Sequence, residues 1–573
     1  MGREGRSSRS RRRGAATAVA GLAAAMLATT LVHTASAQPT SAGGVAAESS
    51  ADAVSLLRVP TPDEADVDRL VAAGADIAPV PGDGYVEVYA HGADDRERLR
   101  EAGFDYDVVI SDLAAHTRAV LAEDAAEART LAASPLPSGR NTYRTYADYG
   151  TDMADLAAAR PDLVEPITLP HRSLLGKEVR GLEIAHDVEA DDGRPVFLLV
   201  GTHHAREWPT AEVVMEFAMD LVHGDGRDER ITDLLERARI IVVPIVNVDG
   251  FDISRSYLHE YKRKNCRLVD GSDDVSPGEC ADADSADLGV DLNRNYGGNW
   301  GGKGASVNPA SGTYRGAAPF SEPEVRNVRD LVSSRQVTSL QSVHNYGGLV
   351  LRPPQQSDTP LTADEALYAE IGDALADATG YRSIPFYQLY DTSGSTGEWS
   401  YFTPGGFGFE FELEGSNFHV GYQEAVVDQY LGIGTQEHAN GGVREALLRQ
   451  FEAAANRDYH AVLEVSAPRG ARLSVEKTFT QQTAPVQEPG GGVGEPIPFT
   501  STLTSQLTAP GGVVEWSVNP SVRPDRDGGT ITESWTVRCE RARGNAWQET
   551  QVTVARGERV AVDLSRCAGG ARP

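Results

Sequence analysis

The feature that most constrains the fold of this chain is an unbroken apolar run that ends in glycine. Val196 to Val200 contains no polar residue and stops at Gly201, which is typical of a strand covered on both faces of a parallel sheet. Apolar side chains then recur at helical spacing between Pro209 and Gly224. Further strand candidates follow at residues 240–248, 339–343 and 407–413. This alternation predicts an α/β domain with a mainly parallel mixed sheet and helices on both faces.

The chain has 573 residues, which is too long for one ordinary domain. Residues 1–37 place arginines before an apolar stretch and end in Ala35-Ser36-Ala37, the pattern of a secretory signal peptide. Residues 38–137 predict a small α+β region whose end, ASPLPSGR, suits a processed linker. Within it we expect helices at 67–73 and 94–102 and strands at 85–89 and 106–110. Residues 138–465 hold the α/β domain, and residues 466–573 predict a small β-sandwich-like domain of unknown role.

Charge and cysteine content restrict the partners and the compartment. The chain holds 53 Lys and Arg against 83 Asp and Glu, a formal net charge of −30. Because nucleic-acid binding depends on clustered cations, we expect no nucleic-acid partner. We also expect no membrane attachment once the signal peptide is removed. The signal peptide predicts a secreted, extracellular protein. In that oxidising compartment Cys266 with Cys280 and Cys539 with Cys567 are the economical pairing among three possible connectivities.

A candidate metal motif follows the apolar run directly. His204 and Glu207 lie three residues apart just past the expected strand end, where an imidazole nitrogen and a carboxylate can bind one ion. His203 lacks a Glu at the same spacing. A lone His-x-x-Glu is weak because about one is expected by chance in a chain of this composition. Catalytic zinc requires a third protein ligand and an open position.

The third ligand and the function come from a resemblance. Five segments in order, GTHHAREW (201–208), PIVNVDGF (244–251), GVDLNRNYGGNW (289–300), SVHNYGG (342–348) and FGFEFELE (407–414), resemble the landmarks of the carboxypeptidase A type zinc metallocarboxypeptidases. The resemblance covers residues 141–460, and residues 38–137 stand where that family carries a propeptide. It implies a secreted bacterial zinc metallocarboxypeptidase that hydrolyses the C-terminal peptide bond of peptides and proteins with a free C-terminus.

The resemblance also implies roles for residues around the metal. His204, Glu207 and His344 match the ligands of one zinc ion. Asp291 matches a carboxylate that accepts the second N–H of the first ligand imidazole and fixes its tautomer. Glu412 matches the general base, and its apolar neighbours should raise its pKa. Glu410 and Glu414 share its strand face, so only the motif selects Glu412.

Further matches concern the substrate. Asn293 and Arg294 match the pair that binds the terminal carboxylate, a task suited to the planar guanidinium. Arg263 matches the arginine that stabilises the oxyanion, with Arg267 as a competitor. Tyr346 and Tyr390 match substrate-side tyrosines, of which Tyr390 closes over the substrate. Gly397 falls at the floor of the pocket for the terminal side chain. This favours large apolar residues, while Glu398 or a neighbouring acid could still admit Lys or Arg.

Alternatives remain at this stage. An acidic stretch between residues 270 and 287 could bind calcium, but it lacks a calcium-loop motif, which favours a solvated disulfide loop. Its acids are Asp270, Asp273, Asp274, Asp282, Asp284 and Asp287. A related enzyme could instead hydrolyse cell-wall peptides or amides, which Arg294 argues against. A non-enzymatic binding protein of the same fold is the third interpretation, and the matched catalytic positions argue against it. We expect a monomer.

Overall fold

The computed structural model describes residues 53–82, 84–130, 133–268, 272–281, 288–434, 440–526, 528–540 and 546–567. The predicted signal peptide lies outside these residues. So do Asp270, Asp282, Asp284 and Asp287 of the acidic stretch.

The N-terminal region forms a small α+β unit whose sheet has the strand order β2-β3-β1-β4. The two predicted helices and two predicted strands are present, with ends that shift by up to three residues. The sequence interpretation missed β1, β2 and the long helix α3, because two prolines interrupt β2 and alanines weaken the amphipathic pattern of α3. The elements are β1 (Val54–Pro60), α1 (Glu64–Ala72), β2 (Asp76–Gly82), β3 (Tyr85–His91), α2 (Ala93–Glu101), β4 (Asp107–Ile110) and α3 (Leu113–Ala128).

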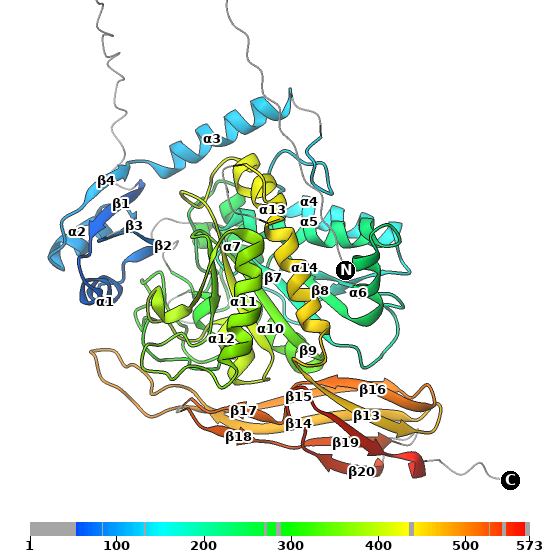
Figure 1. Cartoon of the computed structure of the whole chain (residues 1–573). Coiled ribbons are helices and arrows are strands. Elements are labelled where there is room, and N and C mark those ends of the chain that lie inside the picture. The colour runs from blue at the N-terminus through cyan, green and yellow to red at the C-terminus, as the bar shows by residue number, and fades with distance from the viewer. Residues whose placement is uncertain are drawn as a thin grey trace, which may run out of the picture. The chain divides into compact units, whose positions relative to one another are not determined.

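The central domain is built on an eight-stranded sheet with the order β11-β10-β12-β9-β7-β8-β6-β5. Its four middle strands, β12, β9, β7 and β8, are parallel to one another, while β10 and β6 pair antiparallel with them. Helices cover both faces of this sheet (Figure 1). The strands are β5 (Val164–Thr168), β6 (Arg180–Ile184), β7 (Val196–Gly201), β8 (Arg239–Val243), β9 (Val337–Asn345), β10 (Leu349–Arg352), β11 (Arg382–Pro385) and β12 (Phe407–Leu413). The predicted fold class is confirmed.

The helices of the central domain connect these strands. They are α4 (Tyr146–Ala159), α5 (Trp208–Gly224), α6 (Glu229–Arg237), α7 (Val248–Arg255), α8 (Pro277–Ala281), α10 (Pro323–Ser334), α11 (Glu365–Thr379), α12 (Thr396–Phe402), α13 (Gln429–Leu431) and α14 (Gly442–Ala455). The described part of this domain also contains the short 3-10 helices η1 (Leu292–Arg294) and η2 (Phe386–Gln388) and the π-helical turn η3 (Gln423–Asp428).

The strand predicted at residues 240–248 is shorter than expected. It ends at Val243 because Pro244 follows, which has no N–H for the ladder. Val248 instead begins helix α7, where the Asn247 side chain accepts a hydrogen bond from the N–H of Gly250 at 3.1 Å. Glycine is required at position 201, since a Cβ there would lie 2.8 Å from the carbonyl oxygen of Pro244. The chain can therefore turn sharply after β7.

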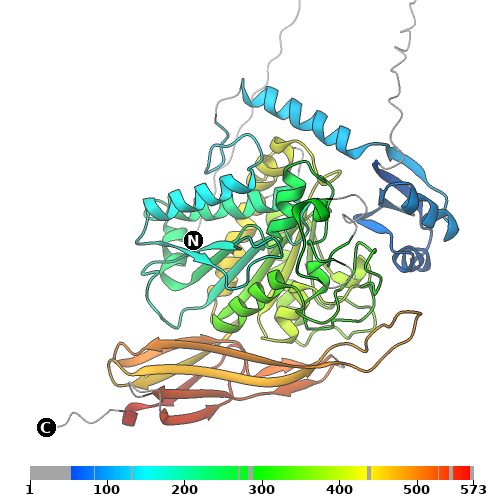
Figure 2. The same cartoon turned by 180° about the vertical axis from the view of Figure 1, so that it is seen from behind.

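The C-terminal region is a β domain with two main sheets, of the orders β16-β13-β21 and β15-β14-β19-β20, and a small two-stranded sheet formed by β17 and β18. Trp516 and Trp535 are buried between its sheets. The predicted Gly-Pro-rich stretch at 489–496 connects β14 to β15, and this connection projects beyond the other strands in Figures 1 and 2. The elements are β13 (Ala461–Ala467), β14 (Arg472–Gln482), β15 (Pro498–Thr508), β16 (Gly512–Val518), β17 (Val522–Pro524), β18 (Thr530–Thr532), β19 (Trp535–Glu540), β20 (Ala546–Val552), β21 (Arg559–Asp563) and η4 (Ser565–Cys567).

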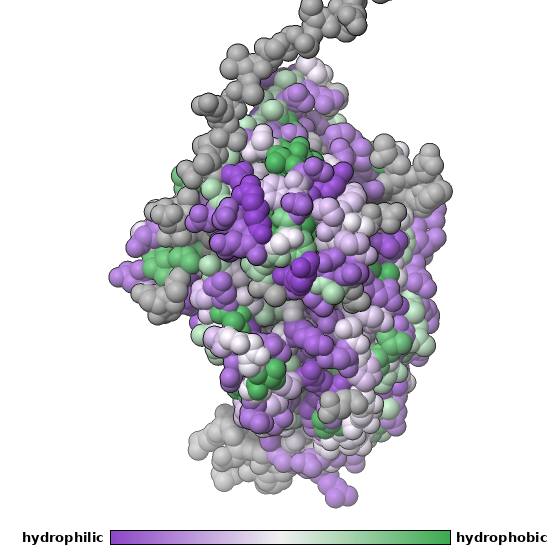
Figure 3. Space-filling view, turned by 90° about the vertical axis from the view of Figure 1, so that its left-hand side faces the viewer, coloured by the Kyte–Doolittle hydropathy of each residue, from purple (hydrophilic) through white to green (hydrophobic). Residues whose placement is uncertain are grey.

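Both predicted disulfides are confirmed: Cys266 pairs with Cys280, and Cys539 pairs with Cys567. Among the described residues, no helix combines the length and apolar character needed to span a bilayer. The face seen in Figure 3 carries mainly hydrophilic side chains with small separate hydrophobic patches.

Candidate active site

Three side chains from the ends of neighbouring parallel strands converge on one point. His204 and Glu207 follow β7, His344 lies near the end of β9, and all three are almost fully buried. The Nδ1 atom of His204 lies 2.7 Å from Oε1 of Glu207 and 3.2 Å from Nδ1 of His344. His344 Nδ1 also lies 3.0 Å from the second carboxylate oxygen of Glu207. The structure thus brings together the three residues that the sequence proposed as ligands.

The donor set fits a zinc ion. Two imidazole nitrogens and one carboxylate are ligands of catalytic zinc sites, and the donor atoms lie within 4.8 Å of one another. The Nε2 atom of His204 contacts Oδ1 of Asp291 at 3.1 Å, so its proton belongs on Nε2 and the Nδ1 lone pair faces the cluster. Burial alone would raise the pKa of Glu207, but the two imidazoles outweigh it and hold that pKa below its ordinary value. A carboxylate is thereby available at neutral pH.

Asp291 links the cluster to Arg263. While one carboxylate oxygen contacts His204, the other accepts hydrogen bonds from Arg263 at 2.7 and 3.2 Å. Burial alone would raise the pKa of Asp291, but the charges of Arg263, His204 and Arg294 hold it well below the ordinary value. Arg263 is therefore fixed beside the candidate metal centre by a carboxylate that also orients a candidate ligand.

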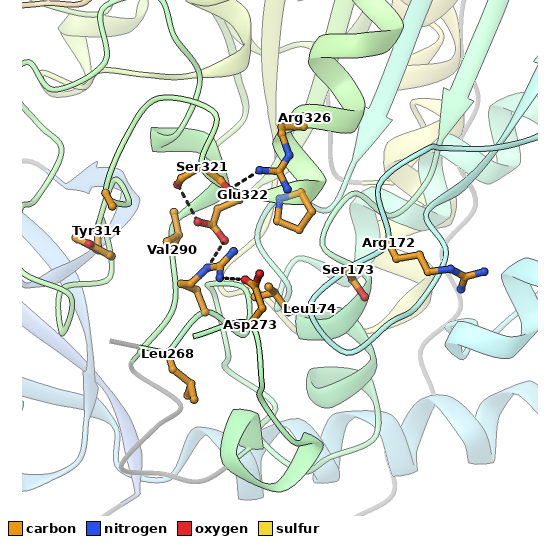
Figure 4. Close-up of a pocket in the computed structure, with 13 residues that line it drawn as sticks. Arg172, Ser173, Leu174, Leu268, Asp273, Val290, Tyr314, Ser321, Glu322 and Arg326 are labelled. Atoms are coloured by element: carbon orange, nitrogen blue, oxygen red, sulfur yellow. Dashed lines mark hydrogen bonds and ion pairs between the residues drawn. The ribbon is translucent and has the colours of Figure 1, made fainter. Parts of the chain in front are cut away.

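Arg267, the competitor of Arg263, lies in a different environment. It lines a polar cavity of about 560 Å³ with Glu322, Asp273 and Arg326. Its guanidinium donates to Glu322 at 3.1 Å and pairs with Asp273, and Figure 4 shows both acids among the residues that line this cavity. Arg263 therefore contacts Asp291, which in turn contacts His204, whereas Arg267 contacts Glu322 and Asp273.

Glu412 stands on β12, which pairs in parallel with β9, and it lies directly opposite His344. It is 7% exposed, and one of its carboxylate oxygens has no hydrogen-bond partner among the described residues. Burial raises its pKa well above that of an ordinary carboxylic acid. A buried carboxylate with a free oxygen next to a candidate metal centre is suited to accept and return a proton.

Asn293 and Arg294 lie in the short turn η1 behind the cluster. The Asn293 amide donates to Oε2 of Glu410 at 2.8 Å, and its oxygen accepts the N–H of Thr396 at 3.0 Å. Arg294 is 2% exposed and donates to the carbonyl oxygen of Asn293, while its Nε has no partner among the described residues. Gly397, the predicted pocket floor, donates its N–H to Oε1 of Glu410 at 2.9 Å. Glu410 thus joins the two predicted substrate-side positions.

The two predicted tyrosines differ in their surroundings. Tyr346 is buried, and its hydroxyl accepts a hydrogen bond of 3.1 Å from the hydroxyl of Tyr89 in the N-terminal unit. Tyr390 is half-buried, and its ring packs edge-on against Phe386 at 5.9 Å. Burial raises its pKa and the charge of Glu412 adds to this, whereas the charges of Arg294 and Arg263 oppose it. Tyr390 therefore borders the same group of residues.

Two contacts were missed at the sequence level. Arg206, which stands between the two ligand positions, is fully buried and pairs through both terminal nitrogens with Asp76 of the N-terminal unit. Its position inside the His-x-x-Glu motif was the available signal. His203 turns away from the cluster, with Nε2 2.8 Å from the hydroxyl of Tyr296 and Nδ1 3.0 Å from that of Ser342. Ser342 also contacts Nε2 of His344 at 3.0 Å, which orients that ring.

Comparisons with known proteins agree with this geometry. Residues 150–425 match the family model described as zinc carboxypeptidase. The chain is 27% identical over 325 residues to carboxypeptidase A5 of Macaca fascicularis, covering 55% of this chain and 70% of that protein. It is 28% identical over 325 residues to carboxypeptidase A1 of Rattus norvegicus, covering 55% and 72%. The crystal structure of carboxypeptidase A from Helicoverpa armigera superposes with a TM-score of 0.56 at 21% identity, covering 71% of this chain and 98% of that one, which shows a shared fold.

Proposed function

We propose that this chain, whose residues 150–425 match the zinc carboxypeptidase family model, is a member of that family and removes the last residue from peptides and proteins with a free C-terminus, using Glu412 as the proton carrier. The observation that carries the proposal is the convergence of His204, Glu207 and His344, with Glu412 on the next strand. His204, Glu207 and His344 would hold the zinc ion, which supplies Lewis acidity for the attack of water on a carbonyl carbon.

Arg294 and Asn293 would bind the terminal carboxylate of the substrate. The Arg294 guanidinium is buried and has an unsatisfied Nε, so a carboxylate there would meet a charged donor in a site with little water. The Asn293 amide adds a neutral donor beside it. Recognition of a free carboxylate restricts cleavage to the last peptide bond.

Glu412 and Arg263 would serve the reaction itself. With its raised pKa, Glu412 can take a proton from the attacking water and give it to the leaving amine. Arg263, held by Asp291, places a permanent positive charge where the carbonyl oxygen becomes negative. Tyr390, half-buried at the border of the site, would close over the bound residue. We propose that the enzyme acts as a monomer.

The N-terminal unit would act as a propeptide that covers the site. It contacts the loop between the first two candidate ligands through the buried pair of Asp76 and Arg206. Its Tyr89 packs with the rings of Phe418 at 4.7 Å and Tyr261 at 5.8 Å and reaches the hydroxyl of Tyr346. These contacts occupy surface next to the cluster, so a peptide could not enter along them until the unit is removed.

Secretion forms part of the proposal. The two disulfides fit an oxidising compartment, and residues 1–37 have the pattern of a signal peptide. Reading the N-terminus of protein collected from culture medium tests both the export and the later removal of the N-terminal unit.

The activity is tested with N-blocked peptides ending in Phe, Leu, Arg or Glu, using protein cleaved between the N-terminal unit and the central domain. We expect release of the terminal residue that stops with a chelator, returns with zinc and is absent when the terminus is amidated. Zinc-loaded, folded protein that releases nothing from any free-terminus peptide would contradict the proposal and favour a hydrolase of cell-wall peptides or amides.

A further inference from the structure

Resting on the proposed function, we propose that Glu410 makes this enzyme select substrates whose last residue carries a cationic side chain, lysine or arginine. The geometry that points to this is a buried carboxylate that lies between Asn293, a proposed binder of the substrate carboxylate, and Gly397.

Glu410 is held firmly inside the site. It stands on β12 two residues before Glu412, so both side chains leave the same face of the strand. It is 2% exposed. Its Oε2 accepts from the Asn293 amide at 2.8 Å, and its Oε1 accepts from the N–H of Gly397 at 2.9 Å. The carboxylate therefore has a fixed position beside the proposed site of the terminal residue.

The glycine at position 397 makes room for this carboxylate. A Cβ atom at that position would lie 3.1 Å from both Cγ and Oε1 of Glu410, tighter than ordinary van der Waals contact. Gly397 brings no charge of its own, which by itself predicts a preference for apolar terminal residues. The structure differs, because Glu410 of β12 brings its own carboxylate against Gly397.

Glu410 lacks a strong cationic partner. Across the part of the chain that the structure describes, its recorded ion pair is with Nε2 of His344 at 3.9 Å, beyond hydrogen-bond reach. No lysine or arginine pairs with it there. Burying a carboxylate without a cation is costly, whereas two neutral donors compensate only in part. A cation delivered by the substrate would complete the site.

The placement matches the covalent structure of a terminal residue. Its carboxylate and its side chain leave the same Cα, so a residue whose carboxylate is bound at Asn293 and Arg294 directs its side chain into their immediate surroundings. A neutral side chain there would leave Glu410 desolvated near the substrate carboxylate, which is unfavourable. A lysine or arginine side chain would instead form a charge-assisted hydrogen bond, so the preference has both an attractive and a repulsive origin.

Glu398, the other acid considered, is less suited to this role. Its Oε1 accepts from the N–H of Gln355 at 3.0 Å, and no contact with Asn293 is recorded among the described residues. A rival interpretation of Glu410 itself makes it a positioning residue that orients Asn293 and His344. That role would affect every substrate equally.

The test compares kcat and KM of zinc-loaded, cleaved enzyme on N-blocked peptides that differ only in a terminal Arg, Lys, Phe or Leu. We expect wild type to prefer Arg and Lys, and Glu410→Gln to lower kcat/KM for these two by roughly ten- to a hundredfold, mainly through KM, without lowering it for Phe and Leu. Glu414→Gln, an exposed acid two residues beyond Glu412, and Glu398→Gln should keep the wild-type ranking.

Four results would overturn the inference, and the fourth would overturn the proposed function with it. A wild-type enzyme that prefers Phe or Leu would overturn the inference without any variant. This result decides the case in which Glu410→Gln fails to fold. An equal loss on all four substrates in Glu410→Gln assigns it a positioning role. A ranking that collapses in Glu398→Gln and survives in Glu410→Gln assigns the preference to the other acid. Release of no terminal residue at all would refute the proposed function and this inference together. The other three results would refute this inference alone, so the two failures can be told apart.

Discussion

Replacing Asp76 with asparagine should activate the uncleaved chain. Asp76 lies on β2 of the N-terminal unit and binds both terminal nitrogens of Arg206, and its side chain is 8% exposed while that of Arg206 is fully buried. Burial alone would raise the pKa of Asp76, but Arg206 and His91 hold it well below the ordinary value. The acid is therefore charged, and asparagine removes that charge with little change in shape.

The structure sets the size of the effect. Removing one partner of a buried pair costs about 3–5 kcal/mol, because the other charge stays buried without compensation. Asparagine keeps one oxygen that can accept from Arg206, and the guanidinium still faces the rings of Phe418 at 4.0 Å and Tyr89 at 4.9 Å. We therefore take the lower end, about 3 kcal/mol. Since about 1.4 kcal/mol is a factor of ten, the undocked fraction should rise roughly a hundredfold.

The assay is release of the terminal residue by uncleaved protein, with each preparation assayed again after cleavage. The uncleaved Asp76→Asn variant should be roughly a hundred times as active as uncleaved wild type, unless nearly all molecules are already open. After cleavage the two should match, which controls for folding. Asp66→Asn removes an exposed pair with Arg69 within α1 and should change nothing. Equal activity of uncleaved Asp76→Asn and uncleaved wild type would refute the reasoning.

Four further outcomes follow from the structure. Limited trypsin digestion should cut first after Arg129, which is exposed at the end of α3, and not after Arg140, which pairs with Asp152, and N-terminal sequencing reads the site. Glu412→Gln should lower kcat by about 10²–10⁴ with unchanged zinc content measured by atomic absorption. Burial lowers the pKa of His460 to about 3, so between that pH and about 6.5 the unfolded chain binds one more proton than the folded chain. The free energy of unfolding therefore falls as the pH drops through this window, by up to about 1.4 kcal/mol per pH unit. Urea denaturation should show a shallower fall in His460→Gln. Trp535→Ala should cost about 3–5 kcal/mol in the same assay, because it empties the core between the C-terminal sheets.

Much of the central domain could be predicted because its strands are buried on both faces. The residue run of β12 was predicted with the ends that the structure has. Strand β7 begins as predicted and is one residue longer, and β9 is two residues longer than predicted at each end. Uniform burial produces continuous apolar runs that end abruptly at polar or glycine residues. The same cue failed at Pro244, where an apolar run continues past the strand, because hydrophobicity alone does not record the missing N–H.

The candidate site was less predictable in its outer contacts. The ligand positions came from a motif, and their convergence follows from β7, β9 and β12 being neighbours in the sheet although residues 204, 344 and 412 are distant in sequence. The contact of Glu410 with Gly397 depends on the approach of α12 to β12, which no local pattern encodes. The pairing of Arg206 with Asp76 likewise joins two units across 130 residues of sequence.

The two flanking units are attached to the central domain by different kinds of contact, and this difference bears on which of them can leave. The N-terminal unit is joined mainly through side chains: the pair of Asp76 and Arg206, the pair of Arg118 and Glu260, an aromatic cluster, and Asp124, which accepts the N–H of Tyr422 at 2.8 Å. Water can replace the polar contacts among these when the unit separates. The C-terminal domain is joined through backbone groups: Ser517 N–H donates to Gly193 O at 2.7 Å, Gln487 N–H to Gly301 O at 2.8 Å, and the Asn519 amide to Val337 O at 2.9 Å. A Cβ on Gly193 would lie 2.2 Å from the carbonyl oxygen of Glu515, so the two backbones approach as closely as within one domain. Phe499 of β15 also packs against Phe320 of the central domain, with ring centroids 5.8 Å apart, so separation would break close packing along the joined backbones. We therefore expect the C-terminal domain to remain with the mature enzyme, where the connection between β14 and β15 supports the segment that follows Asn293 and Arg294.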